Sequence, residues 1–156
     1  MKLRPPAPPV SPLDAHLGFW MRFVSNRVSA EFERAVEARG VSVSEWVALR
    51  TLYDRAGSTH AELMAALGMT KGAVSKVVSR LQDKGLVTRA AHAADARAQV
   101  LALTGAGRAL VPALARDADA NDAHFFGHLT ARKRHELKTL LEEMVRLHRL
   151  EQVPVA

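Results

Sequence analysis

Apolar residues recur at spacings of three and four along most of this chain, which is the pattern of amphipathic helices. The first such pattern begins with Ser11 as N-cap, followed by Pro12, and it ends at Arg39 before Gly40. At about 27 residues, this predicted helix would be roughly 40 Å long at the usual rise per residue. Its apolar surface is wider than one stripe, so we expect part of it to contact another chain.

Two shorter helices follow, and each opens with a capping box. In this motif, the hydroxyl of the first residue accepts a hydrogen bond from the backbone N–H of a glutamate three residues later, and the glutamate side chain accepts one from the backbone N–H of the first residue. The boxes are Ser42 with Glu45 and Thr59 with Glu62. The first helix is expected to end near Gly57 and the second at Gly68. Together with the next helix, residues 59–84 have the pattern of a helix-turn-helix, although hairpins of two helices also occur as plain structure.

The helix from Thr70 to Gly85 has two faces of different character. Its apolar stripe is predicted to be Val74, Val78 and Leu81. Small, hydroxylated and basic residues fill the other positions, namely Lys71, Gly72, Ser75, Lys76, Ser79 and Arg80. Since no carboxylate occurs before Asp83, this surface suits a polyanion, and its small residues would allow a close approach to base edges in a major groove. An ordinary solvated helix face would give the same charge pattern.

Two strand-like runs, residues 86–90 and 98–103, come next and are joined by a polar loop with Asp95 and Arg97 near its tip. A two-stranded hairpin directly after a helix-turn-helix is typical of a wing. An arginine at such a tip can enter a narrow minor groove, where the negative potential of DNA is strongest. The alternative is an arginine in a solvent-exposed turn.

Two further helices complete the pattern. Thr104 caps a helix that extends to about Phe126, and Pro112 is expected to kink it or to end its first segment. Thr130 caps the last helix, which has a strong apolar stripe. The stripe consists of Leu137, Leu140, Leu141, Met144 and Leu147. The first turn of this helix, residues 132–134, is basic where the helix dipole favours acids, so this end is expected to fray unless an acidic partner faces it.

Composition and charge narrow the possible classes of protein. The chain has 156 residues, of which 48% are hydrophobic, enough for one core of ordinary size. Its formal charge is +6, and residues 58–108 hold seven Lys or Arg against three acids, which favours an anionic partner such as nucleic acid. The absence of cysteine excludes disulfides and thiol chemistry. Since no apolar run approaches the roughly 18 residues of a membrane span and the start lacks a signal-peptide core, we expect a cytoplasmic protein without membrane contact.

Three segments, LQDKGLVTR at 81–89, DAR at 95–97 and LALTGAGRAL at 101–110, resemble the winged-helix core of the MarR family of bacterial transcriptional regulators. The resemblance implies a mainly α fold with a small β-wing, in which a winged helix-turn-helix lobe adjoins a helical dimerisation lobe. It also implies a homodimer that binds the double-stranded DNA of a pseudo-palindromic operator, without a cofactor. It divides the chain into a DNA-binding region, 41–103, and a dimerisation region, 11–40 with 104–150, after a proline-rich arm, 1–10, that we expect to be disordered.

By this resemblance, Lys71, Gly72, Ser75 and Lys76 face the bases, and Arg80 lies nearer the phosphates. Asp95 and Arg97 match the wing's Asp-x-Arg motif, in which the arginine enters the minor groove and the aspartate helps to hold the wing. The family often has a second arginine between them, where this chain has Ala96, so minor-groove contacts would fall to Arg97 and Arg89. The predicted DNA-binding residues are Thr70, Lys71, Gly72, Ser75, Lys76, Arg80, Arg89, Asp95 and Arg97.

In this family, the first two helices line a crevice between the two lobes, and here they carry aromatic residues. The predicted ligand-binding residues are Trp20, Phe23, Trp46, Arg50 and Tyr53. Arg22, Arg27 and Arg50 can pair with a carboxylate, so a small aromatic or phenolic anion is the expected effector, and its binding would relieve binding to DNA. Aromatic residues at helical spacing are also typical of a core. Without cysteine, the thiol-based peroxide-sensing variant of the family is excluded.

Other functions remain open at this stage. His124 and His128 have the i, i+4 spacing that can place two imidazoles on one helix face, and Asp117 or Asn121 could add a ligand, so a metal-responsive regulator of the same fold is one alternative. No third ligand stands at a telling spacing, and we therefore predict no metal site. A DNA-binding architectural protein without sequence preference is a second alternative. The chain carries no nucleophile elbow, P-loop or dinucleotide fingerprint, so we expect no enzymatic activity.

Overall fold

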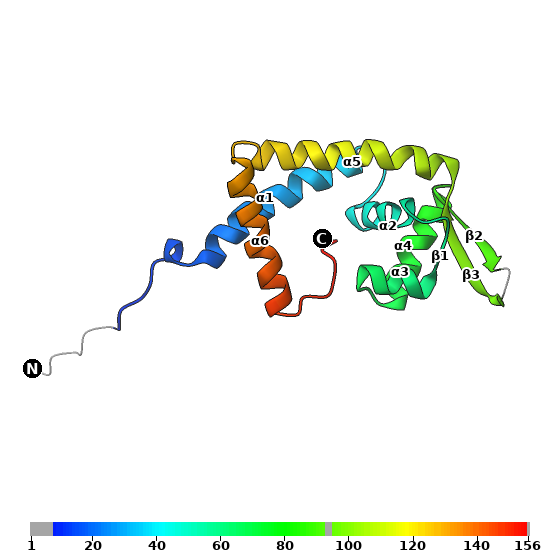
Figure 1. Cartoon of the computed structure of the whole chain (residues 1–156), viewed down its shortest axis with the longest axis horizontal. Coiled ribbons are helices and arrows are strands. Elements are labelled where there is room, and N and C mark those ends of the chain that lie inside the picture. Colours follow the sequence, from blue (N-terminus) through cyan, green and yellow to red (C-terminus); the bar gives the residue numbers. More distant parts are fainter. Residues whose placement is uncertain (1–7, 93–94, 156) are drawn as a thin grey trace, which may run out of the picture.

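The computed structural model describes residues 8–92 and 95–155, and the side chains of residues 92 and 95–98 lie outside this description. Within these residues, the chain forms six α-helices, one 3-10 helix and three β-strands (Figure 1). In chain order they are η1 Leu13–Ala15, α1 Leu17–Glu37, α2 Val43–Tyr53, β1 Ser58–Thr59, α3 His60–Leu67, α4 Lys71–Asp83, β2 Val87–His92, β3 Asp95–Leu103, α5 Gly105–Phe126 and α6 Ala131–Leu147. The expected fold class, mainly α with a small β-wing, is confirmed.

One core joins the winged lobe to the long helix above it. The lobe contains α2, α3, α4 and the sheet, while α5 passes over it with α1 alongside, and α6 descends from the far end of α5 (Figure 1). Leu49 and Leu52 of α2, Leu63 of α3, Leu81 of α4 and Leu114 of α5 are all fully buried. Because α5 contributes to the same core as the helix-turn-helix, α4 is held at a fixed position relative to α5.

Local signals fix the ends of the helix-turn-helix as predicted. Both capping boxes form, with the Ser42 and Thr59 hydroxyl groups accepting hydrogen bonds from the backbone N–H groups of Glu45 and Glu62. The Thr70 hydroxyl accepts from the backbone N–H of Ala73 at 3.2 Å and caps α4. The glycines after α3 and α4, Gly68 and Gly85, have left-handed φ angles of +61° and +70°, which only glycine adopts at low cost.

Two predicted helix ends are wrong. The first helix begins at Leu17 and not after Ser11, because the chain makes a 3-10 turn over Leu13–Ala15 and is extended at His16. The indole Nε1 of Trp20 donates to the Asp14 carbonyl oxygen at 2.8 Å, so this turn is stabilised without a continuous helix.

The second helix ends at Tyr53 and not near Gly57. The chain needs the residues after Tyr53 to turn into β1, which pairs with β3. A Cβ atom at Gly57 would collide with the Val100 side chain of β3, so glycine here allows the close approach of the turn to the sheet.

The sheet contains one strand more than predicted. Its order is β1-β3-β2, and Ser58 and Thr59 of β1 pair with Leu101 and Val100 of β3. A strand of two residues is too short to show an alternating pattern, so its pairing partner alone reveals it. The wing strands are also longer than predicted, since β2 and β3 extend through most of the expected loop, with an irregularity between Ala91 and His92.

Both C-terminal helices form. α5 is capped by Thr104 as predicted and continues through Pro112, so the alternative in which this proline ends a segment is wrong. Val111 and Leu114 are buried on either side of it, and their packing offsets the backbone hydrogen bond that proline cannot make. α6 begins at Ala131.

The basic start of α6 was expected to fray unless an acidic partner faces it, and two carboxylates lie close to its arginines. The Arg132 Nε atom donates to Glu136 at 2.8 Å, and the guanidinium of Arg134 lies 3.8 Å from a carboxylate oxygen of Asp122. No helix in the described part of the chain combines the length and the apolar character that crossing a bilayer requires.

Candidate nucleic-acid interface

α4 is the second helix of the helix-turn-helix, which is the position of the recognition helix in this motif. It presents one face to the core and one to solvent. The predicted stripe of Val74, Val78 and Leu81 is completely buried. Val77, which the predicted stripe did not include, is buried with it. Lys71, Gly72, Lys76, Ser79 and Arg80 are exposed. The helix therefore offers solvent a surface of cations and small residues, and its first turn contains no acidic residue.

Lys71, Lys76 and Arg80 keep their charges available. None of the ion pairs in the described part of the chain involves any of these three residues. A Cβ atom added to Gly72 would meet nothing within 4 Å, so no internal contact requires glycine at this position. The side chains of Lys71, Lys76 and Arg80 are thus not committed to an ion pair within the described chain, and their charge suits an external anionic partner.

His60 is a neighbour of this face that the sequence did not reveal. Its Nε2 atom lies 3.4 Å from the Ser75 hydroxyl oxygen and 3.4 Å from the carbonyl oxygen of Lys71. His60 is the first residue of α3, so the contact joins the start of one helix to the exposed side of the other and leaves Ser75 half-buried. Only the packing of α3 on α4 brings these side chains together.

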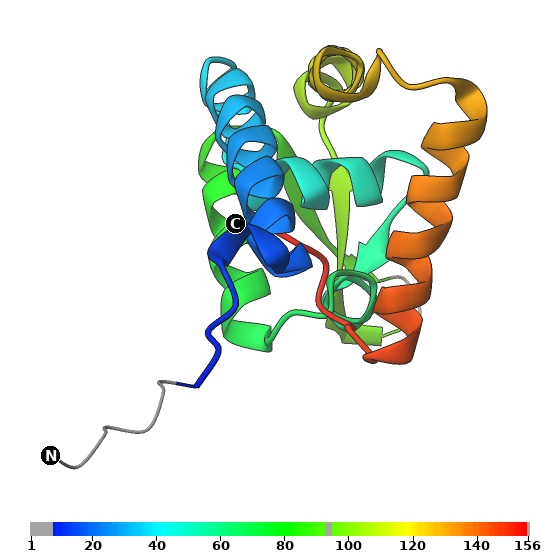
Figure 2. The same cartoon turned by 90° about the vertical axis from the view of Figure 1, so that its left-hand side faces the viewer.

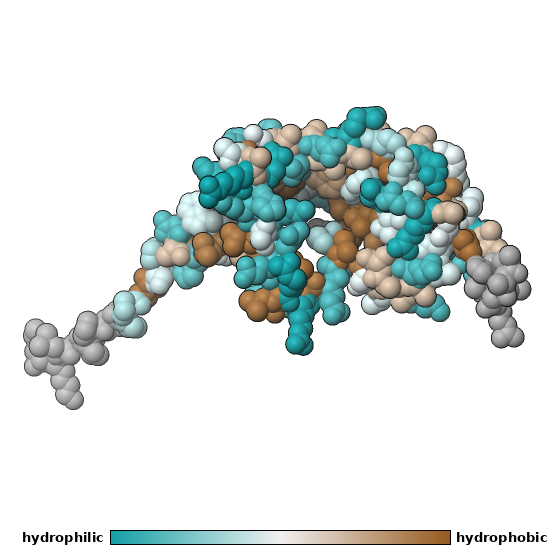
Figure 3. All heavy atoms as spheres, in the orientation of Figure 1, coloured by the Kyte–Doolittle hydropathy of each residue, from teal (hydrophilic) through white to brown (hydrophobic). Residues whose placement is uncertain are grey.

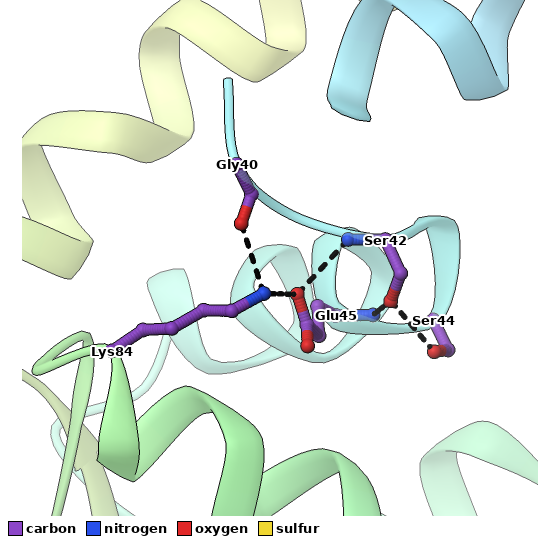
Figure 4. Close-up of polar contacts among 5 residues, drawn as sticks. All are labelled: Gly40, Ser42, Ser44, Glu45 and Lys84. Carbon is purple, nitrogen blue, oxygen red and sulfur yellow. Dashed lines mark hydrogen bonds and ion pairs between the residues drawn. The ribbon is translucent and has the colours of Figure 1, made fainter. Parts of the chain in front are cut away.

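An ion pair between exposed Lys84 and the buried carboxylate of Glu45 anchors the far end of α4 (Figure 4). The Nζ atom of Lys84 donates to Glu45 Oε2 at 2.6 Å and to the Gly40 carbonyl oxygen at 2.9 Å. The same carboxylate oxygen accepts the Ser42 backbone N–H at 2.9 Å, and Glu45 is only 1% exposed. Lys84 therefore contributes its charge to the joint between α4 and α2, and it is not free for a phosphate.

The wing extends beside α4 from the same lobe (Figure 1). Arg89 is exposed on β2, and its guanidinium lies 3.5 Å from the amide oxygen of Gln99 on β3. Asp95 and Arg97 belong to β3 close to the tip, where Asp95 pairs with His92. The predicted roles of the Asp95 and Arg97 side chains lie outside the described residues.

The five predicted ligand residues do not gather around one cavity. Trp20 and Phe23 are exposed on the first half of α1, at 52% and 68%. Trp46 lines a cavity of about 360 Å³ with Phe32, Asn121 and other residues of α1, α2 and α5. Tyr53 lies under the guanidinium groups of Arg50 and Arg108, whose carbon atoms are 5.8 and 5.3 Å from its ring centre.

The cations expected to pair with a carboxylate effector are also separated. Arg50 binds Asp54 at 2.6 Å, and Arg27 binds Glu31 at 3.1 Å, so both already have a carboxylate partner. Arg22 lines a hollow of about 370 Å³ on α1 together with Phe19 and Phe23.

The possible metal site is altered by the end of α5. Because this helix ends at Phe126, His128 lies beyond it and does not continue the helix face of His124. Of the two candidate third ligands, Asp117 accepts a pair of hydrogen bonds from Arg39, one of them at 2.9 Å, which lower the pKa of its carboxyl group. The other, Asn121, donates its amide N–H to the Val28 carbonyl oxygen at 3.2 Å. Among the described side chains, no group of three or more histidines and carboxylates is placed to hold a metal ion.

Comparisons with known proteins agree with this architecture. The model of a family described as the MarR family matches residues 39–98. An HTH-type transcriptional repressor of Mycobacterium tuberculosis is 33% identical over 131 residues, which cover 84% of this chain and 94% of the repressor. Among solved structures, a "probable transcriptional regulator from Pseudomonas aeruginosa" has a TM-score of 0.74 at 28% identity and covers 85% of this chain and 99% of its own.

A structure of BpsR from Bordetella bronchiseptica, which concerns the regulation of its DNA binding by 6-hydroxynicotinic acid, has a TM-score of 0.75. It is 24% identical and covers 87% of this chain and 97% of BpsR, a level of identity that shows a common fold. The family model and the mycobacterial repressor together confirm the predicted family resemblance. The structure from Pseudomonas aeruginosa confirms the predicted fold class.

Proposed function

The chain belongs to the MarR family of transcriptional regulators, and on that premise we propose that it represses transcription by binding a pseudo-palindromic operator as a homodimer. The observation that carries this proposal is the exposed face of α4. It presents Lys71, Lys76 and Arg80 without an acidic neighbour in its first turn. A helix of this kind fits the major groove, where its small and basic residues reach base edges and its flanking cations reach phosphates.

In the proposed complex, Lys71, Gly72, Ser75 and Lys76 face the bases, and Thr70 contacts the DNA at the start of the helix. Arg80 lies nearer the DNA phosphates, because it follows Lys76 by one helical turn and is further from the start of the helix. Arg89, Asp95 and Arg97 belong to the wing, where Arg97 would enter the minor groove.

Unburied apolar surface supports the homodimer. α6 has no buried residue within this chain, although its apolar stripe of Leu137, Leu140, Leu141, Met144 and Leu147 is as strong as any in the sequence. Leu17 of α1 and Leu147 of α6 are 84% and 73% exposed, and apolar residues gather along α1 and the lower end of α6 (Figure 3). A symmetric pair of chains would cover this surface and place two recognition helices about one DNA turn apart.

The domain division follows from this proposal. Residues 41–103 would bind DNA, and residues 11–40 and 104–150 would form the dimer. The predicted disordered arm, residues 1–10, lies mostly outside the described residues, which begin at residue 8.

We further propose that a small aromatic anion relieves DNA binding. The hollow beside Arg22 supports this choice, because it combines one cation with the rings of Phe19 and Phe23. BpsR responds to an aromatic acid, which makes such acids suitable first probes for this chain.

The decisive experiment is selection of bound sequences from a random DNA library, followed by affinity measurements at fixed salt. A repressor should select an inverted repeat and prefer it to random DNA by about three or more powers of ten. An architectural protein would select no repeat. Zinc or a chelator that changes operator binding, with aromatic acids inert, would favour a metal-responsive regulator.

A further inference from the structure

Residues 149–155 return from α6 to the winged lobe (Figure 2). At Arg149 the backbone has a left-handed φ of +52°, which reverses the chain after α6. Residues 151–155 then pass beside α3. There, the backbone N–H of Val153 donates to the carbonyl oxygen of Leu67 at 3.2 Å. The C-terminal segment therefore contacts a part of the chain that is distant in sequence.

The contact completes the end of α3. Leu67 is the last residue of this helix, so its carbonyl oxygen has no acceptor role within the helix and needs a donor from elsewhere. The adjacent residue is Gly68, where an added Cβ atom would lie 2.6 Å from the Glu151 carbonyl oxygen. Glycine at this turn therefore serves two purposes, since it adopts a left-handed φ and leaves space for the returning segment.

The same segment forms part of a cavity wall. Pro154 lines the cavity of about 360 Å³, together with Trp46, Phe32 and Asn121. Val153 and Val155, on either side of Pro154, are half-buried. One short segment thus lines the cavity and also contacts the turn of the helix-turn-helix.

We propose that residues 151–155 act as a strap that holds this turn and closes one side of the cavity. A molecule that fills the cavity contacts Pro154. If it displaces Pro154, the backbone N–H of the adjacent Val153 moves away from the Leu67 carbonyl oxygen, and their hydrogen bond is lost. The turn before α4 would then lose a hydrogen bond, and the position of the recognition helix would become less fixed. The effect on DNA binding rests on the function proposed above, whereas the contacts of the strap do not.

The first test compares two proline substitutions in the full chain. Val153→Pro removes the N–H that Leu67 accepts, while Gln152→Pro removes an N–H that makes no hydrogen bond among the described residues. Hydrogen exchange should become about tenfold faster at the backbone amides of residues 68 and 69 in Val153→Pro only. In a Trp20→Phe background, acrylamide quenching of Trp46 should also increase in that variant. Equal behaviour of the two variants in both measurements would refute the strap.

A second pair of variants tests the fit at the turn. Gly68→Ala and Gly85→Ala both place alanine at a left-handed φ, but an added Cβ atom at Gly85 meets nothing within 4 Å. Gly68→Ala should therefore lower the thermal midpoint more, and adding Val153→Pro to both variants should reduce the difference. A difference that persists unchanged would overturn the proposal. These readouts need no DNA, so a failed operator selection with a confirmed strap would count against the proposed function alone.

Discussion

The ion pair of Lys84 with the buried carboxylate of Glu45 should control the stability of the joint between α4 and α2. Lys84→Met keeps most of the side-chain volume but leaves the Glu45 carboxylate, 1% exposed, without its cation. Removal of one partner from a fully buried pair costs about 3 to 5 kcal/mol. Because the Lys84 side chain is 40% exposed, water can partly replace it, and we expect a loss of about 2 kcal/mol.

A loss of about 2 kcal/mol corresponds to a fall in thermal midpoint of roughly 4 to 8 °C for a chain of this size. The measurement is thermal unfolding at one fixed protein concentration, because a dimer's midpoint depends on concentration. Lys138→Met is the matched control, since Lys138 pairs with Glu142 at 3.6 Å on the surface of α6, with 75% of its side chain exposed. Its cost should be below about 0.5 kcal/mol.

The double variant sharpens this test. Glu45→Gln removes the charge but keeps an oxygen that can accept the Ser42 N–H in the capping box. Adding it to Lys84→Met should restore part of the lost stability, since the uncompensated charge is then gone. Equal midpoints for Lys84→Met and Lys138→Met would show that the buried pair contributes no more than a surface pair.

Three further changes test recognition, assembly and the response to pH. Lys76→Ala should weaken operator binding by about 1 to 3 kcal/mol, because this lysine is proposed to contact a base. Arg80→Ala should weaken binding to all DNA sequences and lower the salt dependence of binding by about one charge. If both variants lose affinity equally on operator and random DNA, these roles are contradicted. Leu140→Asp with Met144→Asp should give monomers in sedimentation and abolish tight operator binding. The hydrogen bonds from the Arg39 guanidinium lower the pKa of Asp117 in the folded protein. The stability that ionised Asp117 contributes is therefore present above its pKa in the unfolded chain, and it is lost as the pH falls through its pKa in the folded protein. Below about pH 4, wild type should therefore lose more stability than Asp117→Asn, as measured by urea unfolding.

The sequence by itself determined the elements whose ends depend on neighbouring residues. The capping boxes at Ser42 and Thr59, the cap at Thr70 and the left-handed Gly68 and Gly85 gave the limits of the helix-turn-helix, because each acts within one helical turn. The buried and exposed faces of α4 also followed from helical periodicity. Fold class and the cationic face of the candidate interface could therefore be predicted.

Tertiary structure decided every feature that joins residues distant along the chain. Strand β1 exists only because Ser58 and Thr59 pair with β3. The predicted aromatic ligand residues are separated because the position of a side chain in space depends on how whole helices pack, which periodicity does not specify.

The same reason explains the contacts that link the site to the rest of the molecule. Lys84 looks like another cation of the recognition helix, yet its partner, Glu45, lies 39 residues away and removes its charge from the interface. The bond from Val153 to Leu67 has no local signal either, because it joins a segment after the last helix to the end of α3. Sequence specified which helices form and which faces they present, and packing specified which charges and backbone groups those faces leave available to a partner.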